Sequence, residues 1–453
     1  MADMEEDMEH EESETGQLLP QHIPTVSSRR YLVLTAFSLL SFCSAAMWIT
    51  FAPCLYIFVL FFFDHVSTAT TNAINSMSAI YMLTYPCFVF LSFRYCKDPP
   101  DGPVGYGLKR GIILGASLTA MGGFFRFVGA LPSQLGFVLV FAGQTLAAIG
   151  QIFIIGLPSR LAVAWFPHDE VNRATAVAVS ANNLGIAAGF VITPLMIHEE
   201  TAVVDIPRAM LYQFLFAFGC VILAMVGFAR YPPQRHFLAQ DDGAESDQVP
   251  VWKDVNFLYL VSAFGIINGV QNAIPTLLAQ TILPVFGHAD EATVGMLGFY
   301  MMIVGIPSSL LTGWYLDRYQ LYSFTCRSLY AVTVATVIIF HLALEVGSFW
   351  LMTVSSILFG IFSWAIMPAI FQYAGELFYP LNEVISAGWL LGSGNLLGML
   401  FVLIMGAMES SAGYTMRYAN LFLISVLVVG MWHMWTVKGQ LRRASALQGG
   451  SNG

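Results

Sequence analysis

Charged residues are scarce in this chain. Of its 453 residues only 10% are Asp, Glu, Lys or Arg, whereas 57% are hydrophobic. About 25% of the residues of a water-soluble domain are charged, so this chain lacks the polar surface that would cover a globule of its size in water. The composition excludes a soluble protein and indicates that a lipid bilayer surrounds most of the chain.

Patterns for metal binding and disulfide bonds are also missing. The six cysteines stand singly, mostly inside apolar runs, with no Cys-x-x-Cys or Cys/His spacing. Histidines such as His341 and His433 lie near helix ends or in loops, where none is placed as a haem ligand. We therefore expect no metal site and no cofactor, and we interpret the cysteines as packing residues.

The acidic residues that are present gather at the start of the chain. The first 30 residues hold eight Asp or Glu against Arg29 and Arg30, a charge of −6 out of the total of −9. Such a segment is typical of a solvated, disordered tail and says little about partners. It is too polar for a cleaved signal peptide, so the first apolar run should itself direct insertion into the membrane.

Twelve apolar runs have about the 20 residues that a helix needs to cross a bilayer. They cover residues 31–60, 72–95, 111–131, 136–160, 171–197, 208–229, 255–283, 293–316, 325–345, 349–373, 384–408 and 416–437. The longest polar connector, residues 230–254, separates the sixth run from the seventh. The sequence predicts an all-α membrane protein with two six-helix bundles, 31–229 and 255–437, a cytosolic linker 230–254 and cytosolic tails 1–30 and 438–453.

The placement of Lys and Arg predicts the orientation of these helices. With both termini in the cytosol, only Arg126, Arg208 and Arg417 lie on the other side, which leaves 16 of the 19 basic residues on the cytosolic side. Cytosolic loops of membrane proteins carry such an excess of positive charge. We therefore expect both termini to be cytosolic.

An internal repeat relates the two predicted bundles. FPHDEVNRATAVAVSANNLG matches YPLNEVISAGWLLGSGNLLG without a gap at an offset of 213, which aligns Glu170 with Glu383 and Asn182 with Asn395. The fifth and eleventh helices are therefore copies of one unit. Internal symmetry of this kind is typical of secondary transporters whose halves rock about a central site.

Polar residues at the middle of apolar helices are costly and therefore mark a candidate pathway. The candidates for substrate contact are Trp48, Tyr81, Gln151, Asn183, Gln271, Asn272 and Asn395. Trp48 lies ~24 Å from either end of its run, which is too deep for an interfacial residue. An indole beside Tyr81 suits an organic cation or a flat ring.

Each of these amides has an alternative role as a hydrogen-bonding contact between helices, whether or not a ligand is present. Asn182 and Asn183 point about 100° apart, so one of them should pack while the other faces the cavity. Gly185, Gly394 and Gly398 lie beside the amides, and we interpret them as points of close helix packing.

Two features of the sequence bear on the gating of the transporter and on whether transport is coupled to protons. Glu170, Arg173 and Glu383 lie at helix starts, where they form either a cytosolic latch between the halves or simple caps. No Asp, Glu, Lys or Arg lies at mid-depth, since Arg126 is toward the outer end of its helix. Without a buried ionisable relay, facilitated transport is the simpler mechanism.

The sequence resembles a known family. GQTLAAIGQIFIIGLPSRLAVAWFPHDEVNRATAVAVSANNLGIAAGF, RRYLVLTAFSLLSFCSAAMWITFAP and YMLTYP resemble the feline leukaemia virus subgroup C receptor-related transporters of the major facilitator superfamily. GWYLDR resembles the superfamily's loop signature, which adds Asp317 and Arg318 to the gating candidates. The equivalent loop of the first half departs from the signature by an insertion.

This resemblance implies transport of choline, ethanolamine, haem or a pyridoxine-like vitamin. It also implies that Trp48 is the tryptophan of the choline-binding aromatic cage. Asn272 stands where the family has the tyrosine that completes the cage, and Asn183 and Asn395 stand for two central glutamines. These replacements make a more polar or a larger substrate as plausible as choline.

The leading hypothesis is a monomeric facilitator for a small organic solute, with the bilayer and the solute as its partners and no nucleic acid. A receptor that binds such a ligand without moving it is the alternative, and an intramembrane enzyme is third because no nucleophile–base set is visible in the helices. Glu14, Leu18 and Leu19 fit an acidic dileucine sorting signal. The plasma membrane and a vacuolar or lysosomal membrane therefore both remain open.

Overall fold

The computed structural model describes residues 28–99, 103, 105–167, 170–229, 253–287, 289–378, 383–408 and 416–439. Its helices are α2 (Arg29–Ile49), α3 (Leu55–Phe63), α4 (Thr68–Tyr95), α5 (Tyr106–Val128), α6 (Gln134–Ile155), α7 (Pro158–Trp165), α8 (Val171–Met196), η1 (Glu199–Thr201), α9 (Ala202–Gly227), α11 (Val255–Thr276), α12 (Leu278–Ile282), α13 (Glu291–Tyr319), α14 (Tyr322–Val346), α15 (Phe349–Leu377), α16 (Glu383–Met408) and α17 (Arg417–Thr436). Twelve of them are long and apolar enough to cross a membrane, which confirms the predicted spans.

Parts of several predictions lie outside the described residues. These are most of the tails 1–30 and 438–453, most of the linker 230–254, and the sorting residues Glu14, Leu18 and Leu19. The side chains of Asp317 and Glu383 are also outside the described part of the chain.

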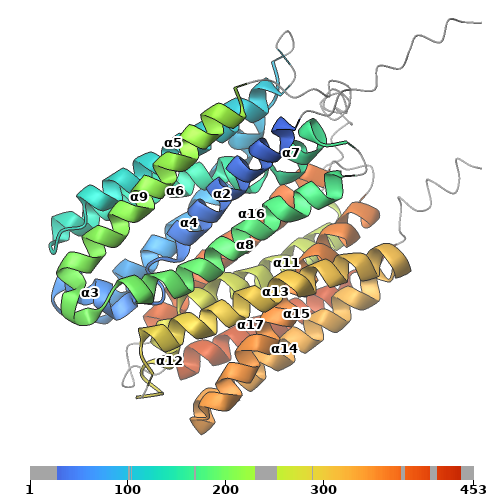
Figure 1. The fold of residues 1–453 in the computed structure, drawn as a ribbon. Coiled ribbons are helices and arrows are strands. Elements are labelled where there is room, and N and C mark those ends of the chain that lie inside the picture. Colours follow the sequence, from blue (N-terminus) through green and yellow to red (C-terminus); the bar gives the residue numbers. More distant parts are fainter. Residues whose placement is uncertain are drawn as a thin grey trace, which may run out of the picture.

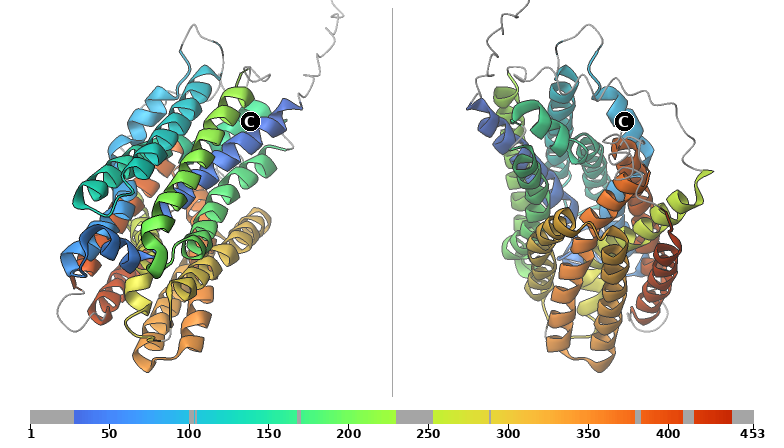
Figure 2. Two further views of the ribbon diagram at one scale, coloured as in Figure 1. Left: turned by 60° about the vertical axis from the view of Figure 1, so that its left-hand side comes forward. Right: turned by 90° about the vertical axis from the view of Figure 1, so that its right-hand side faces the viewer.

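The twelve spans form two bundles that lie side by side (Figures 1 and 2). We call helices α2 to α9 the first half and helices α11 to α17 the second half. The halves meet mainly along two helix pairs, α4 with α16 and α8 with α13. Because the number of crossings is even, α2 begins and α17 ends at the same end of the bundle, which we call the terminal end. The other is the opposite end.

Two of the spans are broken, which the unbroken apolar runs did not predict. The first span stops at Ile49 and resumes at Leu55, and Pro53 within the gap has no N–H to continue the helical hydrogen bonding. The seventh span stops at Thr276, directly after Pro275, and resumes as the short helix α12. The breaks occur at corresponding places in the two halves, as the repeat leads one to expect.

Side-chain caps fix several helix starts at the opposite end. Ser67 and Ser133 accept hydrogen bonds from the backbone N–H groups of α4 and α6. Asp290 caps α13 in the same way, and the hydroxyl and backbone N–H of Thr293 both donate to it. These bonds favour the ionised form and lower the pKa of the Asp290 carboxyl group.

Candidate substrate site

The two halves are joined at the opposite end of the molecule. Asn75 of α4 donates a hydrogen bond to Gln280 of α12 over 2.9 Å, and both side chains are buried. A pocket of about 390 Å³ is lined there by Tyr56 and Val66 of the first half and by Leu283 and Pro284 of the second. Residues from both halves therefore form this end, and a buried amide pair joins them.

Glycines bring α8 and α13 together toward the same end. A Cβ atom on Gly298 of α13 would lie 2.3 Å from the Phe190 ring of α8, and one on Gly295 would lie 2.3 Å from the Phe190 carbonyl oxygen. Phe190 therefore occupies a socket that the glycines of α13 form. The other helix pair between the halves, α4 with α16, also touches at the terminal end, where Gly388 faces Phe93.

Trp48 and Tyr81 lie together on the first half. Trp48, in the last turn of α2, is 8% exposed, and its indole N–H donates to the carbonyl oxygen of Ser78 on α4 over 3.2 Å. Tyr81 follows Ser78 by three residues on the same face of α4, and its buried hydroxyl has no hydrogen-bond partner among the described residues. The structure thus brings these two predicted aromatics to one helix contact.

The amides of the seventh span form a cluster. Gln271 donates to the carbonyl oxygen of Ser363 on α15 over 2.5 Å, and Asn268 donates to Gln271 over 3.4 Å. Asn272 in turn donates to Asn268 over 3.5 Å. Asn268 was not among the predicted residues, although the spacing of residues 268, 271 and 272 places all three amides on one helix face.

Glycines of α16 receive this amide cluster. A Cβ atom on Gly394 would lie 2.2 Å from the side-chain oxygen of Asn268. One on Gly398 would lie 3.2 Å from Asn272 and equally close to the sulfur of Met82, which follows Tyr81 on α4. Asn272 therefore lies where α11, α16 and α4 meet, beside the boundary between the two halves.

The other predicted amides lie outside the cluster around Asn272. Asn395 donates to the carbonyl oxygen of Leu391 in its own helix. Leu391 packs against a cluster of Tyr85, Val89 and Ile152, and Ile152 is the neighbour of the buried Gln151. Asn182 donates to Ser41 of α2, as a packing amide would. Asn183 is half-buried, and no described hydrogen bond joins it to the cluster around Asn272.

Gly185 brings α8 against α2. A Cβ atom there would lie only 2.3 Å from the backbone oxygen of Phe42. This contact is with backbone, which cannot turn away as a side chain can.

At the terminal end, Glu170 has a partner in its own half. Its carboxylate lies 3.3 Å from the guanidinium of Arg30, which also stacks on the Tyr31 ring. Arg173 and Arg318 are exposed. The observed pair therefore ties α2 to the start of α8, and a latch that joins the two halves stays a prediction.

Arg126 lies deeper in the molecule than its place in the sequence predicts. Although it lies near the end of α5, its side chain is 1% exposed and donates to the carbonyl oxygen of Met47, next to Trp48, over 3.2 Å. Gln144 of α6 donates to the same oxygen over 3.3 Å. Among the described residues no carboxylate pairs with Arg126, and the face of the Phe51 ring lies 5.0 Å from the guanidinium carbon.

The expectation that no charge reaches this depth is therefore wrong. Residue position along α5 placed the backbone of Arg126 near the end of the span, but its long side chain extends inward to α2. A guanidinium at the carbonyl end of a helix is favourable for the helix dipole, and it stays protonated, so Arg126 is not a proton relay.

The model of the Major Facilitator Superfamily matches residues 37–400. The chain belongs to this superfamily. The human choline/ethanolamine transporter FLVCR2 is 29% identical over 435 residues, which are 93% of this chain and 79% of that protein. The cat choline/ethanolamine transporter FLVCR1 is 28% identical, over 97% of this chain and 77% of its own length.

Solved structures of other transporters share the fold. A D-xylose–proton symporter superposes with a TM-score of 0.70 at 11% identity and covers 91% of this chain and 98% of its own. The fucose transporter FucP in its outward conformation gives 0.60 at 14% identity, over 91% and 99%. The fold and the family resemblance are confirmed, and this superfamily member is a multi-pass membrane transporter.

Proposed function

We propose that this transporter carries a small amine with a primary ammonium group, such as ethanolamine, in preference to the quaternary amine choline. The relatives named above transport choline and ethanolamine, which supports the class of substrate. The position of Asn272 at the boundary of the halves supports the preference within that class.

The ammonium groups of ethanolamine and choline are stabilised by different surroundings. A primary ammonium has three N–H donors that need acceptors, whereas a trimethylammonium group has none and is held by aromatic faces. Asn272 replaces the cage tyrosine with an amide, and the amides of Asn268 and Gln271 lie on the same helix face. Trp48 remains as one aromatic wall. The site thus offers more acceptors and fewer rings than a choline cage.

Access to this site is proposed to alternate between the two ends. The basic residues indicate that the terminal end is cytosolic. The buried pair Asn75–Gln280 and the contact of Phe190 with α13 join the halves 31–229 and 255–437 at the opposite end, while α4 and α16 also touch at the terminal end. These contacts support a state in which access opens at the cytosolic end when α4 and α16 separate there. Asp205, which is buried, and Glu376, which has a buried carboxyl oxygen, lie near the ends of α9 and α15 and not at mid-depth, so we expect uptake to follow the substrate gradient alone.

Counterflow in liposomes tests this function. We expect the purified protein to exchange labelled ethanolamine at a higher rate than labelled choline, with or without a proton gradient. Trp48→Ala should lower exchange of both amines, while Trp350→Ala, at a residue 74% exposed, should not. Binding of ethanolamine without counterflow would indicate a receptor and contradict the proposal.

The substitution Asn272→Tyr tests the preference. It restores the aromatic ring of the cage and removes the amide acceptor, so the ratio of choline to ethanolamine exchange should rise about tenfold, the effect of about 1.4 kcal/mol. Asn272→Gln keeps the amide and should leave the ratio near that of the unaltered protein. An unchanged ratio in Asn272→Tyr would show that this position does not select the substrate.

A further inference from the structure

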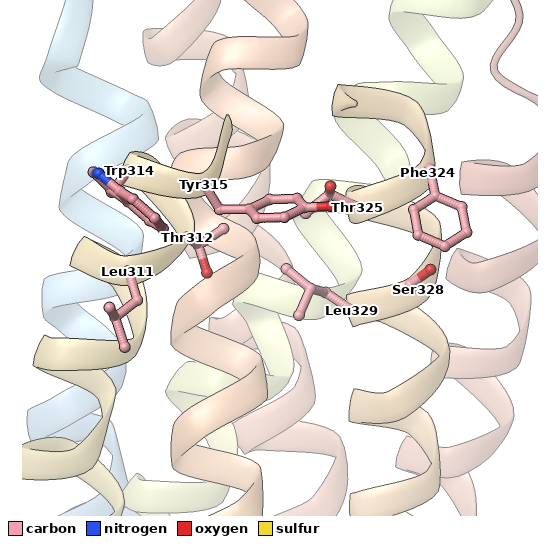
Figure 3. Close-up of a pocket in the computed structure, with 8 residues that line it drawn as sticks. All are labelled: Leu311, Thr312, Trp314, Tyr315, Phe324, Thr325, Ser328 and Leu329. Carbon is pink, nitrogen blue, oxygen red and sulfur yellow. The ribbon is translucent and has the colours of Figure 1, made fainter. Parts of the chain in front are cut away.

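A second cavity lies away from the boundary between the halves. It is a groove of about 440 Å³ between α13 and α14, close to the terminal end (Figure 3). All its lining residues come from these two helices of the second half. The volume is within the range of small-molecule sites, which is roughly 300–1,000 Å³.

The groove faces lipid. Leu311, Trp314 and Phe324 line it and are each 65% exposed, although they belong to helices that cross the membrane. Both helices pack against α15 through their other faces. A side chain with this exposure on a membrane span contacts the bilayer, so the occupant of the groove comes from the bilayer.

The groove also carries a polar group that lacks a partner. Thr325 is 8% exposed, lines the groove, and its hydroxyl has no hydrogen-bond partner among the described residues. In Figure 3 the ring of Tyr315 extends from α13 toward Thr325 on α14. A buried hydroxyl without a partner is unfavourable, so a ligand that brings one polar group to this point would be stabilised.

We propose that this groove binds a membrane sterol, with the sterol hydroxyl on Thr325 and the fused rings between the aromatic side chains. Thr325 lies in the first turns of α14, near the end of the span, where the hydroxyl of a membrane sterol resides, and Leu311 and Leu329 line the groove deeper along the helices. A sterol has one hydroxyl on a rigid ring system, which matches one polar partner and flat aromatic walls. A free acyl chain has no polar atom for Thr325 and loses more conformational freedom on binding.

The local sequence agrees with this assignment. Leu311, Tyr315 and Arg318 follow the Leu…Tyr…Arg order of a short pattern suggested for cholesterol contact. The pattern is weak by itself because it is frequent by chance. Here it coincides with a groove, an exposed aromatic wall and a buried hydroxyl, and this sterol site does not depend on the identity of the transported solute.

Photolabelling tests the site. The full chain in phosphatidylcholine nanodiscs is exposed to a photoreactive cholesterol analogue, and the adducts are mapped by mass spectrometry. We expect adducts on the peptides around residues 311–329, and cholesterol should prevent them better than epicholesterol, whose hydroxyl has the opposite configuration. Thr325→Val, which keeps the side-chain shape, should lower the adduct yield about fivefold, the effect of one lost hydrogen bond.

A matched control separates the groove from general lipid contact. Trp314→Ala should reduce labelling further, whereas Trp432→Ala should not, since Trp432 has a similar exposure of 60% in the corresponding part of α17. The melting temperature of each variant shows whether it is folded. Labelling that is unchanged in Thr325→Val, that is spread evenly over the lipid-facing helices, or that is prevented by added phospholipid but not by cholesterol would overturn the proposal.

Discussion

The two halves of this transporter share a fold but stabilise their broken spans in different ways. In the first half, Arg126 and Gln144 both donate to the carbonyl oxygen of Met47 at the end of α2. In the second half, the end of α11 carries a run of amides, and the Thr276 hydroxyl donates to the carbonyl oxygen of Asn272. A charged group takes part with a neutral amide at the first break, whereas the groups named at the second break are all neutral.

This difference indicates that the two halves offer different hydrogen-bonding groups beside the boundary between them. A guanidinium only donates hydrogen bonds and keeps its charge, so the first half offers a fixed surface at Trp48. An amide both donates and accepts, so the site proposed at Asn272 could bind donor or acceptor groups of a substrate. A cation already occupies the carbonyl end of α2, which supports the proposal that a substrate ammonium group binds at the amides of the second half.

The largest expected effect concerns helix packing and tests whether the first half is the more rigid one. Gly185→Ala places a methyl group 2.3 Å from a backbone oxygen, whereas Gly394→Ala places one 2.2 Å from the side-chain oxygen and 2.7 Å from the Cβ atom of Asn268. The amide oxygen of Asn268 can turn away, but its Cβ atom and the backbone of Phe42 move only with their helices, so we expect Gly185→Ala to cost about 3 kcal/mol and Gly394→Ala about 2 kcal/mol. Melting temperatures of the purified variants measure the difference.

Gly219→Ala is the matched control for both substitutions. No atom lies within 4 Å of a Cβ at Gly219, so alanine should only raise the helix propensity of α9, by about 1 kcal/mol at most. Equal losses of stability for Gly185→Ala and Gly394→Ala would contradict the contrast between a rigid and an adaptable half.

The next effect concerns Arg126. A buried charge without a carboxylate partner is costly, so we expect Arg126→Met to leave the melting temperature unchanged or to raise it. Because α2 then loses the support of its broken end beside Trp48, counterflow should fall at least about tenfold. A lower melting temperature with normal counterflow of the folded fraction would show that Arg126 serves stability alone. Arg208→Met, at an exposed arginine of α9, is the control.

The smallest effect concerns the bond that joins the halves at the opposite end. In a double-mutant cycle of Asn75→Ala and Gln280→Ala, we expect a coupling of about 0.6 kcal/mol, the average for hydrogen bonds between membrane helices. The double variant should also label faster with a membrane-impermeant thiol reagent at a cysteine introduced at Val66. A coupling of zero would mean that packing alone closes this end.

The sequence predicted the spans well because apolar length is a local property. The positions of Gln271 and Asn272 on α11 and of the glycines of α16 can likewise be read from the spacing along one helix, although Asn268 was missed and the substrate roles stay predictions. Partners far apart in the chain could not be predicted, such as Arg30 with Glu170 or Asn75 with Gln280. Arg126 was misjudged because the depth of a backbone atom does not give the reach of a long side chain.

Phe190 in its glycine socket has a mechanical consequence. Because glycines of α13 present backbone and no side chain to the buried Phe190 ring, the contact can act as a joint at which α8 tilts against α13. Val171, at the other end of α8, lies about 28 Å along the helix from this joint. A tilt of about 10° at Phe190 would therefore move the far end of α8 by about 5 Å, enough to admit a small solute while the contact at Phe190 itself stays closed.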